Sequence, residues 1–213
     1  FEPFKKYFDT LLKPTENEDK RIVFNDIPIS ILKTLCSIRM CHYYDQSIMS
    51  RLLFLIADKT NHKLNLADVC LLCDCVVLLL NNNNRELSKI SPSVIEVVRK
   101  LSSLFTRSIA KEKPTYKNLK HFSKLLNAVA KAVYSDQIQY LLASFVVDTT
   151  NYNPSNEDQA KMKVLQAASF PLFSKCSKDQ LNEIKASLHD SHREIFEQLG
   201  KKWQEEAQYK GKV

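Results

Sequence analysis

The sequence predicts an all-α protein. Only two of its 213 residues are glycine, Gly200 and Gly211, whereas tight hairpins and phosphate-binding loops need glycine. This argues against Rossmann, P-loop and β-sandwich folds. Apolar residues recur at helical spacing almost throughout, between turns rich in Asn, Ser, Asp and Pro. We expect antiparallel helix pairs stacked as a HEAT-like α-solenoid or an irregular helical array, although no fixed-period repeat is present.

Composition places the chain among ordinary globular proteins. Apolar residues make up 44% and charged residues 26%, and the net charge of +7 is compatible with an anionic partner. Apolar runs such as Val76 to Leu80 are too short to span a bilayer, so no membrane partner is expected. The sequence begins at Phe1 and not at a methionine, and its first residues are not expected to be a signal peptide. We interpret residues 1–213 as one helical domain, a C-terminal fragment of a larger protein.

Helix boundaries in the first half follow from apolar spacing and turn residues. An opening helix is predicted at 4–12, followed by a charged linker at 15–21. The next helix begins near Pro28 and carries Ile31, Leu35 and Ile38. Two more helices are predicted at 46–59 and from Leu66 to Leu80, the second of which ends at the turn Asn81–Asn84. A further helix is expected to run to about Ile109, with Ser91 as its N-cap and Pro92 at its first position.

The second half shows the same rhythm. Two helices are predicted at 116–133 and 136–148. A third follows Ser155 as its cap, with Glu157 and Asp158 in its first turn. The last two are predicted from a Ser177–Gln180 capping box to Leu188, and from a cap at Asp190 to Tyr209. About ten helices of roughly 10–20 residues result, joined by short loops.

The cysteines are interpreted as core residues of a reduced protein, not as a disulfide framework or a zinc site. Cys70, Cys73 and Cys75 lie in one leucine- and valine-rich helix, where Cys73 and Cys75 point about 160° apart. That spacing does not suit one tetrahedral metal, even with His62 upstream. Cys36 and Cys41 are interpreted in the same way. We therefore predict no metal and no cofactor.

No catalytic constellation is recognisable, so the chain is predicted not to be an enzyme and to have no small-molecule substrate. His189-Asp190-Ser191-His192 contains triad residue types, but neighbours in sequence do not make triad geometry. The pairs Glu205-Glu206 and Glu157-Asp158 are typical of helix surfaces. A helical hydrolase with an unrecognised site is the weakest of the alternatives.

The strongest functional signal is basic. Residues 99–131 contain nine Lys or Arg and one acid, Glu112. On a helical wheel, Lys117, Lys120, Lys124 and Lys131 fall within an arc of about 60°, opposite an apolar face. Like charges at this spacing repel one another, which an anionic partner such as RNA phosphate would relieve. The candidate RNA-binding residues are Arg107, Lys111, Lys113, Lys117, Lys120, Lys124 and Lys131.

A lysine face that only solubilises the helix is an equally simple interpretation of the same pattern. The sequence shows no aromatic-interleaved stacking platform and no RNA-recognition signature. Sequence-specific reading of bases is therefore not expected.

The C-terminal stretch carries a string of spaced residues, namely Ser177, Gln180, Leu181, Ala186, Ser187, Leu188, Arg193, Phe196 and Leu199. Through them, residues 116–213 resemble a nucleolar family called unhealthy ribosome biogenesis protein two, or nucleolar pre-ribosomal-associated protein two. The segments 119–126 and 140–142 resemble the helices before that signature. The chain departs from the family pattern at His189 and His192.

The resemblance implies a non-enzymatic nucleolar scaffold acting in early large (60S) subunit assembly and pre-rRNA processing. Its implied partners are other assembly factors, including a companion helical scaffold and a DEAD-box helicase, which act on pre-rRNA; whether the chain contacts the pre-rRNA itself is left open by the resemblance. The alternative is a protein-only HEAT- or armadillo-like adaptor that binds peptide segments in transport or signalling. Salt dependence distinguishes the two, because phosphate binding weakens steeply with salt and an apolar groove is nearly indifferent to it.

Overall fold

A computed structural model of the chain describes residues 28–37, 46–61, 63–82, 87–112, 114–133, 135–150 and 159–209. These residues form helices and connecting turns without strands. The predicted helix at 4–12, the linker at 15–21 and the turn and first-turn acids at 151–158 lie outside the described residues. So do Ile38, Cys41, His42, His62 and Lys113. The prediction of an all-α protein is confirmed.

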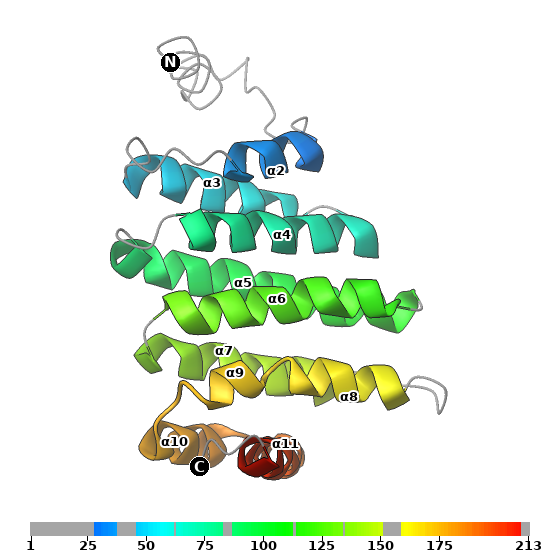
Figure 1. The fold of residues 1–213 in the computed structure, drawn as a ribbon, viewed down its shortest axis with the longest axis vertical. Coiled ribbons are helices and arrows are strands. Elements are labelled where there is room, and N and C mark those ends of the chain that lie inside the picture. The colour runs from blue at the N-terminus through cyan, green and yellow to red at the C-terminus, as the bar shows by residue number, and fades with distance from the viewer. Residues whose placement is uncertain are drawn as a thin grey trace.

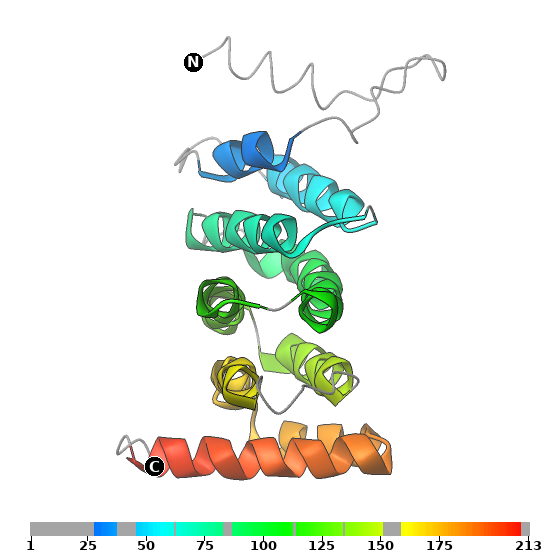
Figure 2. The same cartoon turned by 90° about the vertical axis from the view of Figure 1, so that its right-hand side faces the viewer.

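The helices are arranged in two layers (Figures 1 and 2). The first layer contains α2 (Ile29–Ser37), α4 (Leu66–Asn82), α6 (Tyr116–Ala132), α8 (Gln159–Ala167) and α9 (Phe170–Phe173); the second contains α3 (Gln46–Lys59), α5 (Leu87–Lys111) and α7 (Ser135–Thr150). Each helix packs against its neighbours in its own layer, α4 between α2 and α6, and α5 between α3 and α7. The chain therefore crosses between the layers at successive helices.

Two further helices close the C-terminal end of the stack. They are α10 (Lys178–Ser187) and the long α11 (Asp190–Tyr209), and both pack against α7. In Figure 2, α11 runs across the base of both layers and reaches beneath α8 and α9. Its second half therefore lies on the same side of the molecule as α6.

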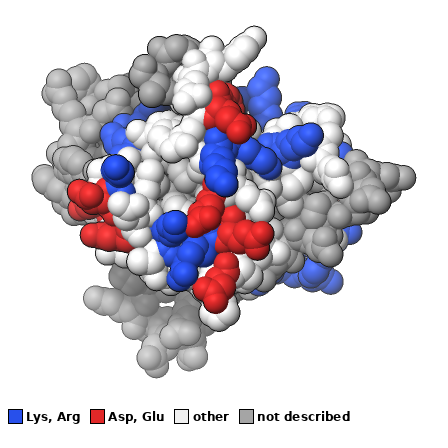
Figure 3. Space-filling view, turned by 90° about the horizontal axis from the view of Figure 1, so that it is seen from below, with Lys and Arg blue, Asp and Glu red and all other residues white. Residues whose placement is uncertain are grey.

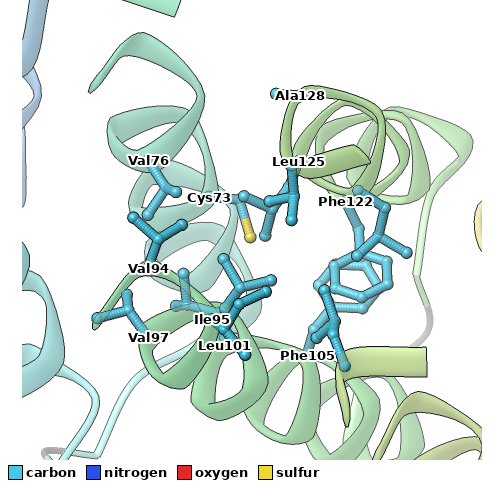
Figure 4. Close-up of a cluster of buried hydrophobic side chains, with 14 of the residues drawn as sticks. Cys73, Val76, Val94, Ile95, Val97, Leu101, Phe105, Phe122, Leu125 and Ala128 are labelled. Carbon is cyan, nitrogen blue, oxygen red and sulfur yellow. The ribbon is translucent and has the colours of Figure 1, made fainter. Parts of the chain in front are cut away.

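The core lies between the two layers. In Figure 4, Cys73 of α4, Leu101 and Phe105 of α5, and Phe122 and Leu125 of α6 meet in one apolar cluster. The rings of Phe105 and Phe122 stack with centroids 4.5 Å apart, and Phe122 stacks on Phe145 of α7 at 6.1 Å. One aromatic column thus joins three successive helices across the layers.

Two predicted helix starts are wrong. Ser91-Pro92 lies inside α5, which begins at Leu87, so Ser91 is not its N-cap and Pro92 is not its first residue. Pro92 falls early in this 25-residue helix and has no N–H, so one backbone hydrogen bond of the helix is lost. The packing of the rest of α5 outweighs the loss of that one bond. Asp190 is the first residue of α11 and not its cap, because the Arg193 amide already donates to the His189 carbonyl at 2.8 Å.

Gly200 lies in the middle of α11, where no left-handed backbone conformation calls for glycine. A methyl group at this position would lie 3.8 Å from the Phe173 ring, an ordinary van der Waals distance. Because glycine costs helix stability relative to alanine, Gly200→Ala is expected to raise the free energy of unfolding by about 0.5–1 kcal/mol. Urea denaturation of both proteins measures this change. A destabilised variant would show that the ring packs closer than described.

Candidate nucleic-acid interface

The lysine face of α6 begins at a well-defined helix start. Thr115 and Asn118 form a reciprocal cap: the Asn118 amide donates to Thr115 Oγ1 at 3.3 Å and the Thr115 amide to Asn118 Oδ1 at 2.9 Å. The apolar face of the helix is buried, as the helical wheel predicts, through Leu119, Phe122, Leu125, Leu126, Val129, Ala130 and the adjoining Val133. Cap and core together fix the direction in which the opposite face points.

That opposite face carries Lys117, Lys120, Lys124 and Lys131, here named the lysine stripe. All four side chains are exposed, and α6 contains no acidic residue. Among the described residues, none of the four has a carboxylate within ion-pair distance. From Lys117 to Lys131 the stripe extends about 21 Å along the helix axis. It is therefore a row of uncompensated positive charge on the outer surface of the first layer.

Glu112, the one acid within residues 99–131, lies at the N-terminus of α4. Its carboxylate accepts from the Leu66 amide at 3.3 Å, where a negative charge also complements the helix dipole. Glu112 thus has a structural role at another helix.

The structure separates the other candidate RNA-binding residues from the lysine stripe. Arg107 and Lys111 belong to α5 in the second layer, whereas the stripe is on the first (Figure 2). Arg107 donates to the backbone oxygen of Ser103 at 3.2 Å, and its charge acts on Asp148 of α7. Arg99 pairs with Glu96 at 2.9 Å. The run of charge that is continuous in sequence is therefore divided between two faces in the fold.

Beside the stripe lies a charged cluster that the sequence did not reveal. Asp74 of α4 accepts a hydrogen bond from Lys33 Nζ of α2 at 2.6 Å, and His121 Nδ1 of α6 lies 2.6 Å from its other oxygen. Three helices of the first layer are joined in this way. An acid inside an otherwise apolar helix is the signal that could have indicated it, since a partly buried carboxylate requires partners.

Burial by itself would raise the pKa of Asp74, but the hydrogen bonds and charges of Lys33 and His121 outweigh it and hold the pKa below its ordinary 3.8. Because the pKa of Asp74 is lower in the folded protein than in the unfolded chain, its ionised carboxylate stabilises the fold above about pH 4. This stabilisation is lost as the pH falls through the pKa of Asp74 in the folded protein. We expect the free energy of unfolding to fall more between about pH 5 and pH 3 in the wild type than in Asp74→Asn. Urea denaturation at about pH 5 and about pH 3 measures the free energy of unfolding, with Asp179→Asn as the control. Equal losses in wild type and Asp74→Asn would contradict it.

The cysteines occupy the core, as predicted for Cys36, Cys70, Cys73 and Cys75. A hydrogen bond with Cys75 and burial raise the pKa of Cys36, and burial raises the pKa of Cys73. Without a metal, the raised pKa values favour the protonated thiols. Within the described residues, no cluster of three or more Cys, His, Asp or Glu could hold a metal ion.

The C-terminal signature residues shape the junction between α10 and α11. Ser177 and Gln180 form the predicted capping box, with the Ser177 amide donating to Gln180 Oε1 at 2.8 Å. Arg193 donates to the backbone oxygens of Lys185 at 3.0 Å and Leu188 at 3.1 Å. It also lies 3.4 Å from Asp190. The side chain thus closes the C-terminus of α10 from the first turn of α11.

The remaining signature positions contribute to packing or lie at the surface. Leu188, Phe196 and Leu199 are buried, Leu181 is half-buried, and the Phe196 ring stacks on Phe173 at 5.3 Å. Ala186 and Ser187 are exposed, and the Ser187 hydroxyl donates to the Ile184 carbonyl at 2.8 Å. The signature residues therefore account for the packing and capping of a helix junction.

No family model, no curated protein and no solved structure matches the chain. None of the helices in the described part is long and apolar enough to cross a membrane. Fold and site together define an all-α protein in two helical layers with an uncompensated basic helix face.

Proposed function

We propose that the chain is a non-enzymatic helical scaffold domain whose lysine stripe binds RNA through its phosphates. The observation that carries this proposal is the stripe itself: four exposed lysines on one helix, held outward by a buried opposite face, without an acidic partner among the described residues. Neutralising phosphates with such a row releases counterions, which favours binding. The contacts would follow the backbone and would not depend on base identity.

The two-layer packing supports a HEAT-like arrangement as part of the proposal. The pairs would be α2 with α3, α4 with α5, and α6 with α7, each with one member in either layer. Arrays of this kind present long surfaces to large partners, which suits a scaffold.

The resemblance of residues 116–213 to the nucleolar family supports a setting for this activity. The RNA would be pre-ribosomal, the compartment the nucleolus, and the process early assembly of the large ribosomal subunit. The partners would be other assembly factors, including a companion helical scaffold and a DEAD-box helicase. Affinity purification of the tagged protein, followed by sequencing of the RNA and identification of the proteins, tests this setting. Transport or signalling partners without ribosomal precursor RNA would contradict it.

A salt titration tests RNA binding against the peptide-adaptor alternative. With a fluorescent single-stranded RNA, we expect the logarithm of the association constant to fall linearly with the logarithm of salt, by about 0.7 for each phosphate contact. Four contacts through the stripe predict a slope of about −3. Binding that is indifferent to salt would favour an apolar peptide groove and contradict the proposal.

A further inference from the structure

A groove of about 590 Å³ opens beside the lysine stripe, where helices from distant parts of the sequence meet. One wall is Asn127 of α6. The other walls are mostly apolar, formed by Ala167 at the end of α8, Phe170 and Pro171 of α9, and Trp203 and Ala207 of α11, with Ser174 and Glu206 as their polar members. The groove exists because α11 passes beneath α8 and α9 (Figure 2), so that its second half lies on the same side of the molecule as α6 and lines the groove together with Asn127.

The position of Asn127 connects the groove to the stripe. Lys124 lies three residues before it and Lys131 four residues after it, so all three share one face of the helix. Along the helix axis, the two lysines lie about 4.5 Å and 6 Å from Asn127. The groove therefore opens at the widest gap between neighbouring lysines of the stripe, with a positive charge on either side.

Trp203 is the only tryptophan in the sequence, and its ring is held in place on the groove wall. It packs against Phe173 with ring centroids 5.8 Å apart, and its indole N–H donates to Ser174 Oγ at 3.0 Å. The side chain remains half-buried, as does Phe170. A fixed, partly exposed aromatic ring is a surface on which a nucleic-acid base can stack at little entropic cost.

We infer that this groove accepts a base of a single-stranded RNA whose phosphates lie on Lys124 and Lys131. The inference rests on the proposed function of the stripe and names the form of RNA that it binds. Proteins that bind single strands combine a positive track for the backbone with aromatic side chains for the bases, and here the fold places both together. A duplex, whose bases are already stacked, would engage the lysines alone.

The fluorescence of Trp203 tests this directly, because no other tryptophan contributes to the signal. The full chain is titrated with a single-stranded RNA 12-mer, with the same sequence as a duplex, and with inorganic polyphosphate. We expect the single strand to quench Trp203, and the duplex and polyphosphate to bind without quenching. Quenching by polyphosphate to the same extent as by RNA would overturn the inference. Quenching by a poly-glutamate peptide but not by RNA would also overturn it, and would assign the groove to a protein partner.

A groove-filling variant gives a second readout. Ala167→Phe narrows the groove and leaves every lysine in place, while Ala160→Phe adds the same ring to an exposed site two turns earlier on α8. We expect Ala167→Phe to weaken single-strand binding about tenfold and to leave polyphosphate binding unchanged. Ala160→Phe is expected to match the wild type.

The two proposals fail in different ways. Salt-dependent RNA binding that neither quenches Trp203 nor responds to Ala167→Phe would overturn the groove inference and leave the lysine stripe in place. RNA binding that is unchanged when the stripe lysines are reversed to glutamate would overturn the proposed function itself.

Discussion

Replacing Phe122 with alanine is expected to lower the free energy of unfolding by about 3–5 kcal/mol. The ring has no exposed surface and lies at the centre of the aromatic column, between Phe105 and Phe145. Truncation removes its transfer free energy and leaves a cavity where α5, α6 and α7 meet. Because a domain of this kind is stable by about 5–15 kcal/mol, the loss would be a large part of the total.

Phe54→Ala is the matched control for this substitution. The side chain is 65% exposed on α3, so the same truncation is expected to cost less than about 1 kcal/mol. Urea denaturation followed by circular dichroism measures both variants. A loss below about 1 kcal/mol for Phe122→Ala would contradict the layered core, since a ring at its centre has no route to solvent without unpacking.

Reversing three lysines of the stripe, Lys117, Lys120 and Lys124, to glutamate is expected to weaken RNA binding about a hundredfold at about 0.1 M salt. For single-stranded nucleic acid, each phosphate contact contributes about 0.7 to the salt slope, so three lost contacts amount to about two powers of ten between 1 M and 0.1 M salt. The slope itself should become shallower by about 2. The fold should persist, because all three side chains are exposed.

The control reverses Lys175, Lys178 and Lys201, which are also exposed but lie at the C-terminal end of the stack. Figure 3 shows interleaved basic and acidic side chains on this end, and Lys185 pairs with Glu197 at 2.6 Å. The total change of charge is the same in both triple variants. An equal loss of affinity in both would mean that net charge, not the stripe, governs binding. An unchanged affinity in the first would remove the stripe from RNA binding.

The sequence predicted those parts of the fold that depend on local patterns. In α6, one apolar face and one lysine face are separated cleanly, so both the buried residues and the direction of the stripe were predictable. The Ser177 capping box also follows from local spacing and is confirmed. The contacts of Arg193 with the carbonyls of α10 likewise join residues close in sequence. Such features need only neighbouring residues and helix geometry.

Features that depend on tertiary packing were missed. Pro92 is a strong local start signal, yet α5 begins five residues before it, at Leu87. The cluster around Asp74 draws on α2, α4 and α6, and the groove places Trp203 beside Asn127 although 76 positions separate them in sequence. For the same reason Arg107 and Lys111, close to the stripe in sequence, lie on the other layer.

Ultraviolet crosslinking of the protein to single-stranded RNA, with mass spectrometry of the nucleotide-bearing peptides, tests the central claim most directly. The proposal predicts crosslinks concentrated in α6 between Tyr116 and Lys131, together with the part of α11 that contains Trp203. Weak or absent labelling is expected on the second layer, including Arg107 of α5. Crosslinks concentrated on α5, or spread evenly over exposed lysines, would contradict an RNA-binding role for the lysine stripe.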